Sequence, residues 1–398
     1  MNRTRFRRAR WPVTLCAGLF AAQALHLSAS LQRLPETPAR RWITGYVAGY
    51  ERDLLPLGEL NWRAMTDVTV ARVVPLGDGR LDASFDIGPL GGPRWASAVV
   101  EAAHSHGVRA TLMLGGAGTH DAFASAASPA HRERFVNEVL GWVSRAGFDG
   151  LDLDWEPLLP ADERDLRALA RSFRQKRPGL LLSLPLGYVN SNFAAEEARP
   201  SLVALAPLFD RINLMSYAMA GDQPGWASWH AAALRGETGA TPTSVHSSVR
   251  AYLAAGLPAG KLGVGVGLFG QCFQGVSGPR QAAPFRIVAS DGDMSYVHIL
   301  RDYLKPGLGH WDAVAGVPYL GAPTRFGPRR CSYVSYDDAR SVALKAGYAR
   351  EQGLGGLIVW TVAQGHLHTG PVAARDPLLT AMKANFQATP GAGRGTEP

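Results

Sequence analysis

Residues 148–157 read FDGLDLDWEP, and the alternation in this stretch indicates a β-strand. Side chains of a strand alternate between two faces, so Asp152, Asp154 and Glu156 share one face and apolar side chains occupy the other. Three carboxyl groups on one face repel one another, and each loses water on burial. A solvated surface strand is the alternative, which the apolar flanking residues disfavour. We therefore expect a buried ladder of carboxyl groups with pKa values pushed apart, an arrangement typical of catalytic general acids.

The rest of the chain alternates short apolar runs with amphipathic helical patterns. It has 398 residues, of which 46% are hydrophobic, so it can bury a large core. We expect strands near residues 43–49, 68–74, 109–116, 148–156, 180–186, 211–217, 262–268 and 356–361, and helices near 95–106, 131–145, 161–175, 243–255, 336–352 and 376–386. This α/β alternation predicts a closed (β/α)8 TIM barrel with the ladder on its fourth strand. A doubly wound open sheet is the alternative, but no Gly-x-Gly-x-x-Gly follows the first strand.

The connection between the seventh and eighth strands is too long for a plain loop. Within it, residues 285–288, 296–303 and 311–319 predict a small α+β insertion. The predicted organisation is a signal peptide and leader at 1–30, the barrel at 40–270 and 354–387, an insertion-containing segment with barrel helix 7 at 271–353, and a disordered tail at 388–398.

The first residues resemble a targeting segment. Five arginines and no acidic residue precede an apolar stretch from Trp11 to Leu27, and small residues at 22–24 or 28–30 offer cleavage sites. This pattern predicts a secretory signal peptide and a secreted or periplasmic protein. An uncleaved membrane anchor is the alternative, although the apolar stretch is near the short limit for spanning. After signal removal we expect no integral membrane domain.

Charge and cysteine content give two further expectations. Subtracting the five leader arginines lowers the formal net charge from +8 to +3 (8 − 5), and no basic stripe follows, so we expect no nucleic-acid partner. Cys272 and Cys331 are the two cysteines beyond the leader, and in an exported chain they predict one disulfide. Two buried free thiols are the alternative. Because both cysteines flank the insertion, a bridge there could fasten the base of the insertion to the barrel.

The run Asp149-x-x-Asp152-x-Asp154-x-Glu156 resembles the signature that chitinases of glycoside hydrolase family 18 carry on the fourth barrel strand. The resemblance covers most of residues 43–385. Weaker matches follow in the family's order: Gly45-Tyr46, Gly115-Gly116, Met215-x-Tyr217 and Gly355-Gly356-x-x-x-Trp360. The insertion also looks like the small α+β insertion of many such enzymes.

The resemblance implies a retaining glycosidase that hydrolyses β-1,4 linkages of N-acetylglucosamine polymers, either chitin or chito-oligosaccharides. In this family the substrate's own acetamido oxygen replaces a protein nucleophile. It implies that Glu156 is the general acid, that Asp154 orients the acetamide, and that Asp152 shares a proton with Asp154. Tyr217 would hold the acetamido group, with ordinary strand packing as the alternative. We expect Asp149 to secure the start of the strand.

Several aromatic residues are candidates for contact with sugars. By resemblance Trp360 forms the floor under the distorted sugar, since indole rings pack well on sugar C–H faces. Tyr46 and Met215 would line the same cavity, with core packing as the alternative for Tyr46. Trp226 and Trp229, after the sixth strand, would stack on further sugars or else anchor their loop. The histidines lack metal-ligand spacing, so we expect no metal and no cofactor.

Two positions depart from the family's pattern. Ala218 lies where the family often has Asp after the strand-six tyrosine, which puts substrate affinity and pH dependence in question. Met113 lies where the family often has Ser before the strand-three Gly pair, which bears on the tuning of Asp152.

Two rival functions remain open: an endo-β-N-acetylglucosaminidase acting on glycans, and a non-catalytic chitin-binding lectin on the same barrel. We expect a monomer without a separate carbohydrate-binding module. Soluble oligomers or accessible chitin chains are therefore the expected partners, rather than crystalline surfaces.

Overall fold

The structure is a computed structural model that describes residues 41–282 and 284–388. The predicted leader at residues 1–30 lies outside the described residues, as does the predicted tail from residue 389 onward. Among the described residues, no helix is long and apolar enough to cross a membrane. The barrel and its insertion belong to one compact unit.

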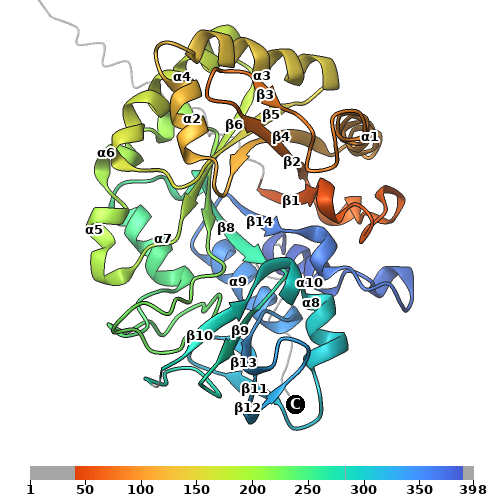
Figure 1. Ribbon diagram of the computed structural model, residues 1–398, viewed down its shortest axis with the longest axis vertical. Coiled ribbons are helices and arrows are strands. Elements are labelled where there is room, and N and C mark those ends of the chain that lie inside the picture. The colour runs from red at the N-terminus through yellow and green to blue at the C-terminus, as the bar shows by residue number, and fades with distance from the viewer. Residues whose placement is uncertain (1–40, 283, 389–398) are drawn as a thin grey trace, which may run out of the picture. The chain divides into compact units, whose positions relative to one another are not determined.

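The described residues contain the predicted closed barrel of eight parallel strands (Figure 1). Its strands are β1 (Trp42–Ala48), β2 (Asp67–Pro75), β4 (Arg109–Gly116), β5 (Gly150–Trp155), β6 (Leu181–Gly187), β7 (Arg211–Met215), β8 (Leu262–Gly267) and β14 (Gly356–Trp360). β1 pairs in parallel with both β2 and β14, and these pairings close the sheet. The strands read as apolar runs because both of their faces are buried, as parallel sheets require. β2 also forms a short antiparallel pair with β3 (Leu81–Asp82).

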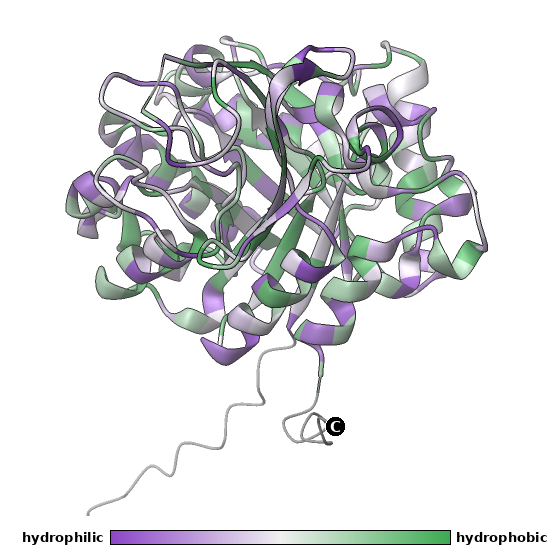
Figure 2. Ribbon diagram, turned by 90° about the horizontal axis from the view of Figure 1, so that it is seen from below, coloured by the Kyte–Doolittle hydropathy of each residue, from purple (hydrophilic) through white to green (hydrophobic). Residues whose placement is uncertain are grey.

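Helices cover the outside of the barrel (Figure 1). They are α1 (Gly91–Ser105), α2 (His120–Ala127), α3 (Arg132–Ala146), α4 (Glu163–Lys176), α5 (Ala194–Glu197), α6 (Pro200–Val203), α7 (Val245–Ala254), α9 (Ala339–Glu351) and α10 (Pro377–Phe386). Hydrophobic and hydrophilic residues alternate along the helices (Figure 2), as expected for elements with one buried stripe. In α3, for example, Phe135, Val136, Val139 and Val143 form that stripe.

The long connection between β8 and β14 forms the predicted α+β insertion. Its five-stranded antiparallel sheet has the order β10 (Arg286–Ala289), β9 (Gln271–Gln274), β13 (Cys331–Ser335), β12 (Val317–Phe326) and β11 (Gly309–Asp312). The short helix α8 (Tyr296–His298) follows β10. β10 overlaps the predicted segment 285–288, β11 and β12 overlap the two ends of segment 311–319, and α8 begins at residue 296, where the third segment begins.

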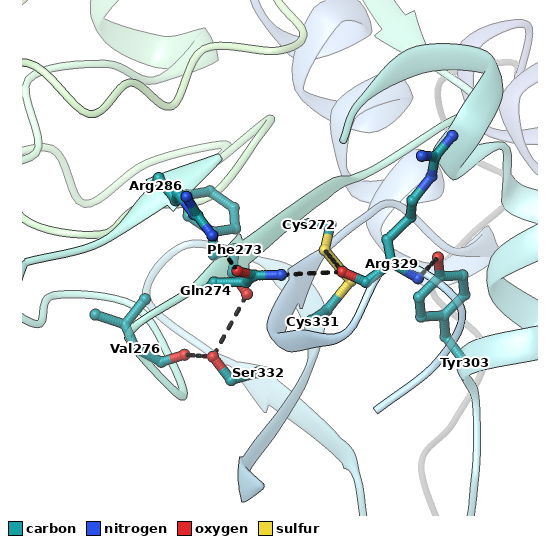
Figure 3. The surroundings of a disulfide bond; sticks show 9 residues. All are labelled: Cys272, Phe273, Gln274, Val276, Arg286, Tyr303, Arg329, Cys331 and Ser332. Atoms are coloured by element: carbon teal, nitrogen blue, oxygen red, sulfur yellow. Dashed lines mark hydrogen bonds between the residues drawn. A yellow bond between two sulfur atoms is a disulfide. The ribbon is translucent and has the colours of Figure 1, made fainter. Parts of the chain in front are cut away.

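A disulfide joins Cys272 on β9 to Cys331 on β13 (Figure 3). Both cysteines lie inside the insertion sheet, where these two strands pair directly. The expectation that the bridge fastens the insertion to the barrel is therefore wrong. Gln274 Nε2 donates a hydrogen bond to the carbonyl oxygen of Arg329 beside the bridge, at 3.1 Å. The disulfide thus cross-links the centre of the insertion.

Replacing both cysteines with serine should lower the free energy of unfolding by about 2–4 kcal/mol, since the bridge closes a long loop in the unfolded chain. Urea unfolding under oxidising conditions measures this loss. Wild-type protein should become equally unstable when reduced, whereas the double serine variant should not respond to reductant. Equal stability of the variant and the oxidised wild type would contradict the prediction.

Candidate active site

The carboxyl ladder lies at the carboxyl-terminal end of β5, where active sites of this barrel type form. Asp152 and Asp154 point from β5 into the barrel and are buried, and Glu156 follows directly after the strand. Asp149 Oδ2 accepts a hydrogen bond from the backbone N–H of Ala110 at 2.8 Å, so it secures the start of β5 as expected. A Cβ atom at Gly115 would lie 2.3 Å from the carbonyl oxygen of Asp154, so glycine there permits the close approach of β4.

Asp152 is held by two hydroxyl groups deep in the barrel. Tyr46 Oη donates to one carboxyl oxygen at 2.6 Å, and Ser183 Oγ donates to the other. Burial raises the pKa of Asp152 to about 6, against the lowering effect of these hydrogen bonds and of the Arg211 charge. Met113 lies directly opposite on β4 and offers no hydroxyl donor. The departure at position 113 thus leaves Asp152 dependent on Ser183 and Tyr46.

Asp154 and Glu156 are coupled carboxyl groups, and a hydrogen bond between them raises the pKa of Asp154 and lowers the pKa of Glu156. Burial raises the pKa of both groups, and the negative charges of Glu156 and Asp152 raise that of Asp154 further. A hydrogen bond between two carboxyl groups requires one proton between them. The expectation that Asp152 shares a proton with Asp154 stays a prediction, and the charges of both Asp152 and Glu156 raise the pKa of Asp154. The three groups still titrate as one unit.

A cavity of about 220 Å³ opens beside this pair. Six of the predicted site residues line it: Tyr46, Asp154, Glu156, Met215, Tyr217 and Trp360. The rings of Tyr46 and Trp360 lie 5.5 Å apart and are tilted by 53°. A cavity with aromatic walls and a few convergent polar groups is typical of small-ligand sites. A larger cavity of about 640 Å³ lies elsewhere, beside residues 58–63, and contains no part of the ladder.

Tyr217 lies just after β7 and lines the same cavity as Asp154 and Glu156. Burial raises its pKa well above the ordinary value, and the charges of Asp154 and Glu156 add to this effect. Its ring packs edge-on against Phe269, with ring centroids 5.9 Å apart. The hydroxyl therefore stays protonated and is available as a hydrogen-bond donor.

Trp229 does not face the cavity. Its side chain is fully buried, its Nε1 donates to the carbonyl oxygen of Thr243 at 2.6 Å, and the Arg280 guanidinium lies 4.7 Å from its ring centre. The prediction that Trp229 stacks on a sugar is therefore wrong, and the residue anchors its loop. Trp226 is partly exposed and does not line this cavity, so its contact with further sugars stays a prediction.

Arg72, on β2, is a site residue that the sequence reasoning missed. Its Nη1 donates to the carbonyl oxygen of Gly115 at 3.3 Å, and its Nε pairs with Asp86 at 3.2 Å. Its positive charge lowers the pKa of both Asp154 and Glu156, in opposition to burial. A lone charged residue inside the apolar run VTVARVVP was the available signal.

Asp291 and Gln364 were also missed. Asp291 reaches the cavity from the insertion, and no sequence pattern indicates which insertion residue does so. Among the described residues, no group of three or more His, Cys, Asp or Glu side chains could hold a metal ion.

Comparisons with known proteins show the family to which the chain belongs. Residues 94–365 match the family model of glycosyl hydrolases family 18. The chain is 28% identical over 272 residues to chitinase A1 of Niallia circulans. The alignment covers 60% of this chain and 38% of that protein. It is 29% identical over 272 residues to a class V chitinase of Arabidopsis thaliana, and the alignment covers 63% of this chain and 68% of that protein. A chitinase-like effector of Moniliophthora perniciosa is 25% identical over 404 residues, with 85% and 86% coverage.

Solved structures share the fold. The group IV chitinase of Ostrinia furnacalis in complex with allosamidin has a TM-score of 0.73 at 22% identity, and covers 87% of this chain and 99% of its own. A class V chitinase of Nicotiana tobaccum in complex with NAG4 has a TM-score of 0.69 at 21% identity, with 88% and 99% coverage. Together with the family match and the carboxyl ladder, these likenesses identify the chain as a chitinase-like member of glycosyl hydrolases family 18.

Proposed function

We propose that the protein is a retaining glycosidase that hydrolyses β-1,4 linkages of N-acetylglucosamine polymers, with the substrate's acetamido oxygen as the nucleophile. The observation that carries the proposal is the hydrogen-bonded pair of Asp154 and Glu156 in a cavity that also holds the Tyr217 hydroxyl and the Trp360 indole. This set provides an acid, an anion, a neutral donor and an apolar surface in one place. Those are the four groups that substrate-assisted hydrolysis needs.

The reaction begins with proton transfer from Glu156 to the glycosidic oxygen. The acetamido oxygen attacks the anomeric carbon while the glycosidic C–O bond breaks and the sugar that received the proton leaves as an alcohol. Asp154, as a carboxylate, accepts the acetamide N–H and stabilises the positive oxazolinium ion that forms. Tyr217 donates its hydroxyl to the acetamido oxygen and orients it for the attack. Glu156, now ionised, takes a proton from water, and this water opens the oxazolinium ion with retention of configuration.

Asp152 acts electrostatically on the pair of Asp154 and Glu156. Its negative charge raises the pKa of Asp154, which keeps a proton within the Asp154–Glu156 pair until the substrate arrives. Ser183 and Tyr46 fix its orientation. Asp152 is therefore a positioning residue that acts through Asp154.

The rival functions make different predictions in one experiment. We expect the mature protein to cleave chitohexaose into shorter oligosaccharides, as resolved by chromatography. Release of glycans from glycoproteins without cleavage of chitohexaose would favour an endo-β-N-acetylglucosaminidase, and binding without cleavage would favour a lectin. The insertion contributes Ser290 and Asp291 to the cavity wall, which supports an extended oligosaccharide as the substrate.

We also propose a cellular location and an oligomeric state for the protein. The arginine-rich leader supports export to the periplasm or the medium. We propose that the mature protein acts as a monomer on chito-oligosaccharides or accessible chitin chains. Sequencing of the mature N-terminus and light scattering of the purified protein test these two points.

Arg72→Gln should move the pH profile of kcat/KM to higher pH. The Arg72 charge lowers the pKa of Asp154 and Glu156, so its removal makes both groups hold their protons to higher pH. We expect the midpoints of both the acidic and the basic limb to move up by about 0.5 to 1 pH unit. The shift is modest because Arg72 is partly exposed and water screens its charge. Arg72→Lys, which keeps the charge, should shift less. Arg94→Gln, on the exposed face of α1, should leave the profile unchanged. A shift to lower pH would contradict the role of Arg72.

A further inference from the structure

Arg211 is a buried arginine inside the barrel that the proposed chemistry does not use. It is the first residue of β7, and 5% of it is exposed. Its register partner on β6 is Ser183, and Ser183 in turn pairs with Asp152 on β5. Partners on neighbouring strands of a pleated sheet point to the same face. Arg211 therefore points into the barrel, two strands away from Asp152.

The guanidinium group of Arg211 crosses the barrel to the opposite wall. β2 and β7 are four strands apart in the closed sheet of eight, so they face each other. Arg211 Nη2 donates to both carboxyl oxygens of Asp67 on β2, each at 3.2 Å, and Nη1 donates to Thr44 Oγ1 at 3.3 Å. The guanidinium carbon also lies 4.7 Å from the ring centre of Trp42. These contacts hold the positive charge at a fixed place inside the barrel.

The charges around Asp67 do not balance by themselves. Asp67 is fully buried and is shared by two guanidinium groups, because Arg109 Nε lies 2.8 Å from its Oδ1. One carboxylate thus faces two cations. The Arg109 side chain is 43% exposed, so water screens its charge, whereas the buried charge of Arg211 is screened much less. A second buried carboxylate near Arg211 is therefore electrostatically favourable.

Asp152 is such a carboxylate. The groups that act on it come from several strands: Tyr46 on β1, Asp154 on β5 itself, Ser183 on β6, Arg211 and Asn213 on β7, and Tyr217 just after β7. Burial favours the protonated form of Asp152, whereas Arg211 and the hydrogen-bond donors favour the ionised form. Among these groups, Arg211 carries the positive charge. It therefore opposes burial by a means that a neutral donor does not offer.

We propose that Arg211 is a positioning residue of the active site, and that its guanidinium group, fixed by Asp67 across the barrel, keeps Asp152 ionised. An ionised Asp152 is the state whose charge retains the proton of the Asp154–Glu156 pair. The effect on catalysis rests on the proposed function, whereas the charge balance does not. An ion pair buried for stability alone gains little, because both charges lose water. The Arg211–Asp67 pair instead supplies a charge to the carboxyl ladder.

Carbon-13 NMR of aspartate carboxyl groups measures the titration of Asp152 directly, and the signal lost in Asp152→Asn identifies it. In Arg211→Gln the midpoint should rise by about 1 pH unit, since the charge that favours ionisation is gone. In Asp67→Asn the midpoint should fall, because the amide oxygen still accepts hydrogen bonds from Arg211 but no longer repels Asp152. General loosening of the barrel would not give opposite shifts in these two variants.

Two further variants are the controls. Arg211→Lys keeps the positive charge and should shift the midpoint much less than Arg211→Gln. Arg164 lies on α4 with a side chain that is 83% exposed, so Arg164→Gln makes the same change of charge outside the barrel. It should leave the midpoint of Asp152 unchanged. The fall expected for Asp67→Asn decides the question even if Arg211→Gln does not fold.

The same shifts should appear in the pH profile of kcat/KM on chitohexaose. Protonation of Asp152 removes the charge that acts on Asp154, so the acidic limb should move up in Arg211→Gln and down in Asp67→Asn. The basic limb should stay in place, because it reports loss of the proton that Asp154 and Glu156 hold. This response differs from that of Arg72→Gln, which moves both limbs.

The inference is overturned by an unchanged Asp152 midpoint in Arg211→Gln, by shifts of the same sign in Arg211→Gln and Asp67→Asn, or by an equal shift in Arg164→Gln. Shifted midpoints with an unchanged pH profile would overturn the role in catalysis. Failure of the wild type to cleave chitohexaose would overturn the proposed function instead, and the NMR midpoints would still decide whether Arg211 keeps Asp152 ionised.

Discussion

Glu156→Gln should lower kcat on chitohexaose by about 10²- to 10⁴-fold, the range typical for loss of a general acid. The amide has the shape of the carboxyl group but cannot release a proton to the glycosidic oxygen. The amide N–H can still donate a hydrogen bond to Asp154, so the contact between the two side chains is kept. We therefore expect the Kd for the oligosaccharide to stay within about threefold of the wild-type KM. Steady-state kinetics and calorimetry on the same preparations measure the two quantities.

Glu133→Gln is a suitable control for this variant. Glu133 lies in the first turn of α3 with an exposed side chain, so the same change of charge should leave kcat and KM unchanged. Unchanged activity of Glu156→Gln would show that Glu156 is not the acid. Loss of binding together with activity would show that the substitution damages the cavity instead.

Asp154→Asn should lower kcat by about 10²-fold or more, the effect expected when one preorganised electrostatic contact to the transition state is lost. An amide neither stabilises the positive oxazolinium ion nor returns the shared proton to Glu156. The charge of Asp154 matters most after bond cleavage begins, so KM should change much less than kcat. Measurement of kcat and KM at several pH values separates these effects.

Asp149→Asn provides the comparison within the same sequence motif. Its amide oxygen can still accept the hydrogen bond from Ala110 that Asp149 makes, and the residue lies at the far end of β5 from the cavity. We expect kcat to stay within about twofold of wild type. Similar losses for Asp149→Asn and Asp154→Asn would mean that any substitution in the motif disturbs the strand, which would contradict a specific role for Asp154.

Much of the fold could be predicted because its determinants are local. Each barrel strand is a short apolar run buried on both faces, and observed strand bounds lie within two residues of the predicted ones. The ladder followed from the same reasoning, since a period of two places Asp152, Asp154 and Glu156 on one face. The insertion was indicated by a connection too long to remain a loop.

What could not be predicted depends on contacts between distant segments. Trp229 lies in a loop, where no periodicity tells a buried ring from an exposed one, and its burial depends on Thr243 and Arg280. The partner of Asp154 is set by side-chain rotamers, which no strand pattern specifies. Asp291 reaches the cavity only through the folded insertion. The two cysteines were paired correctly, but their strands both proved to belong to the insertion sheet.

The most direct test of the central claim is the anomeric configuration of the first products released from chitohexaose. Proton NMR in the opening minutes, before mutarotation, reports this configuration at the new reducing ends. Attack by the substrate's acetamido oxygen followed by water inverts the anomeric carbon twice, so the account predicts an initial excess of the β-anomer. An initial excess of the α-anomer would contradict it, as would the absence of any cleavage.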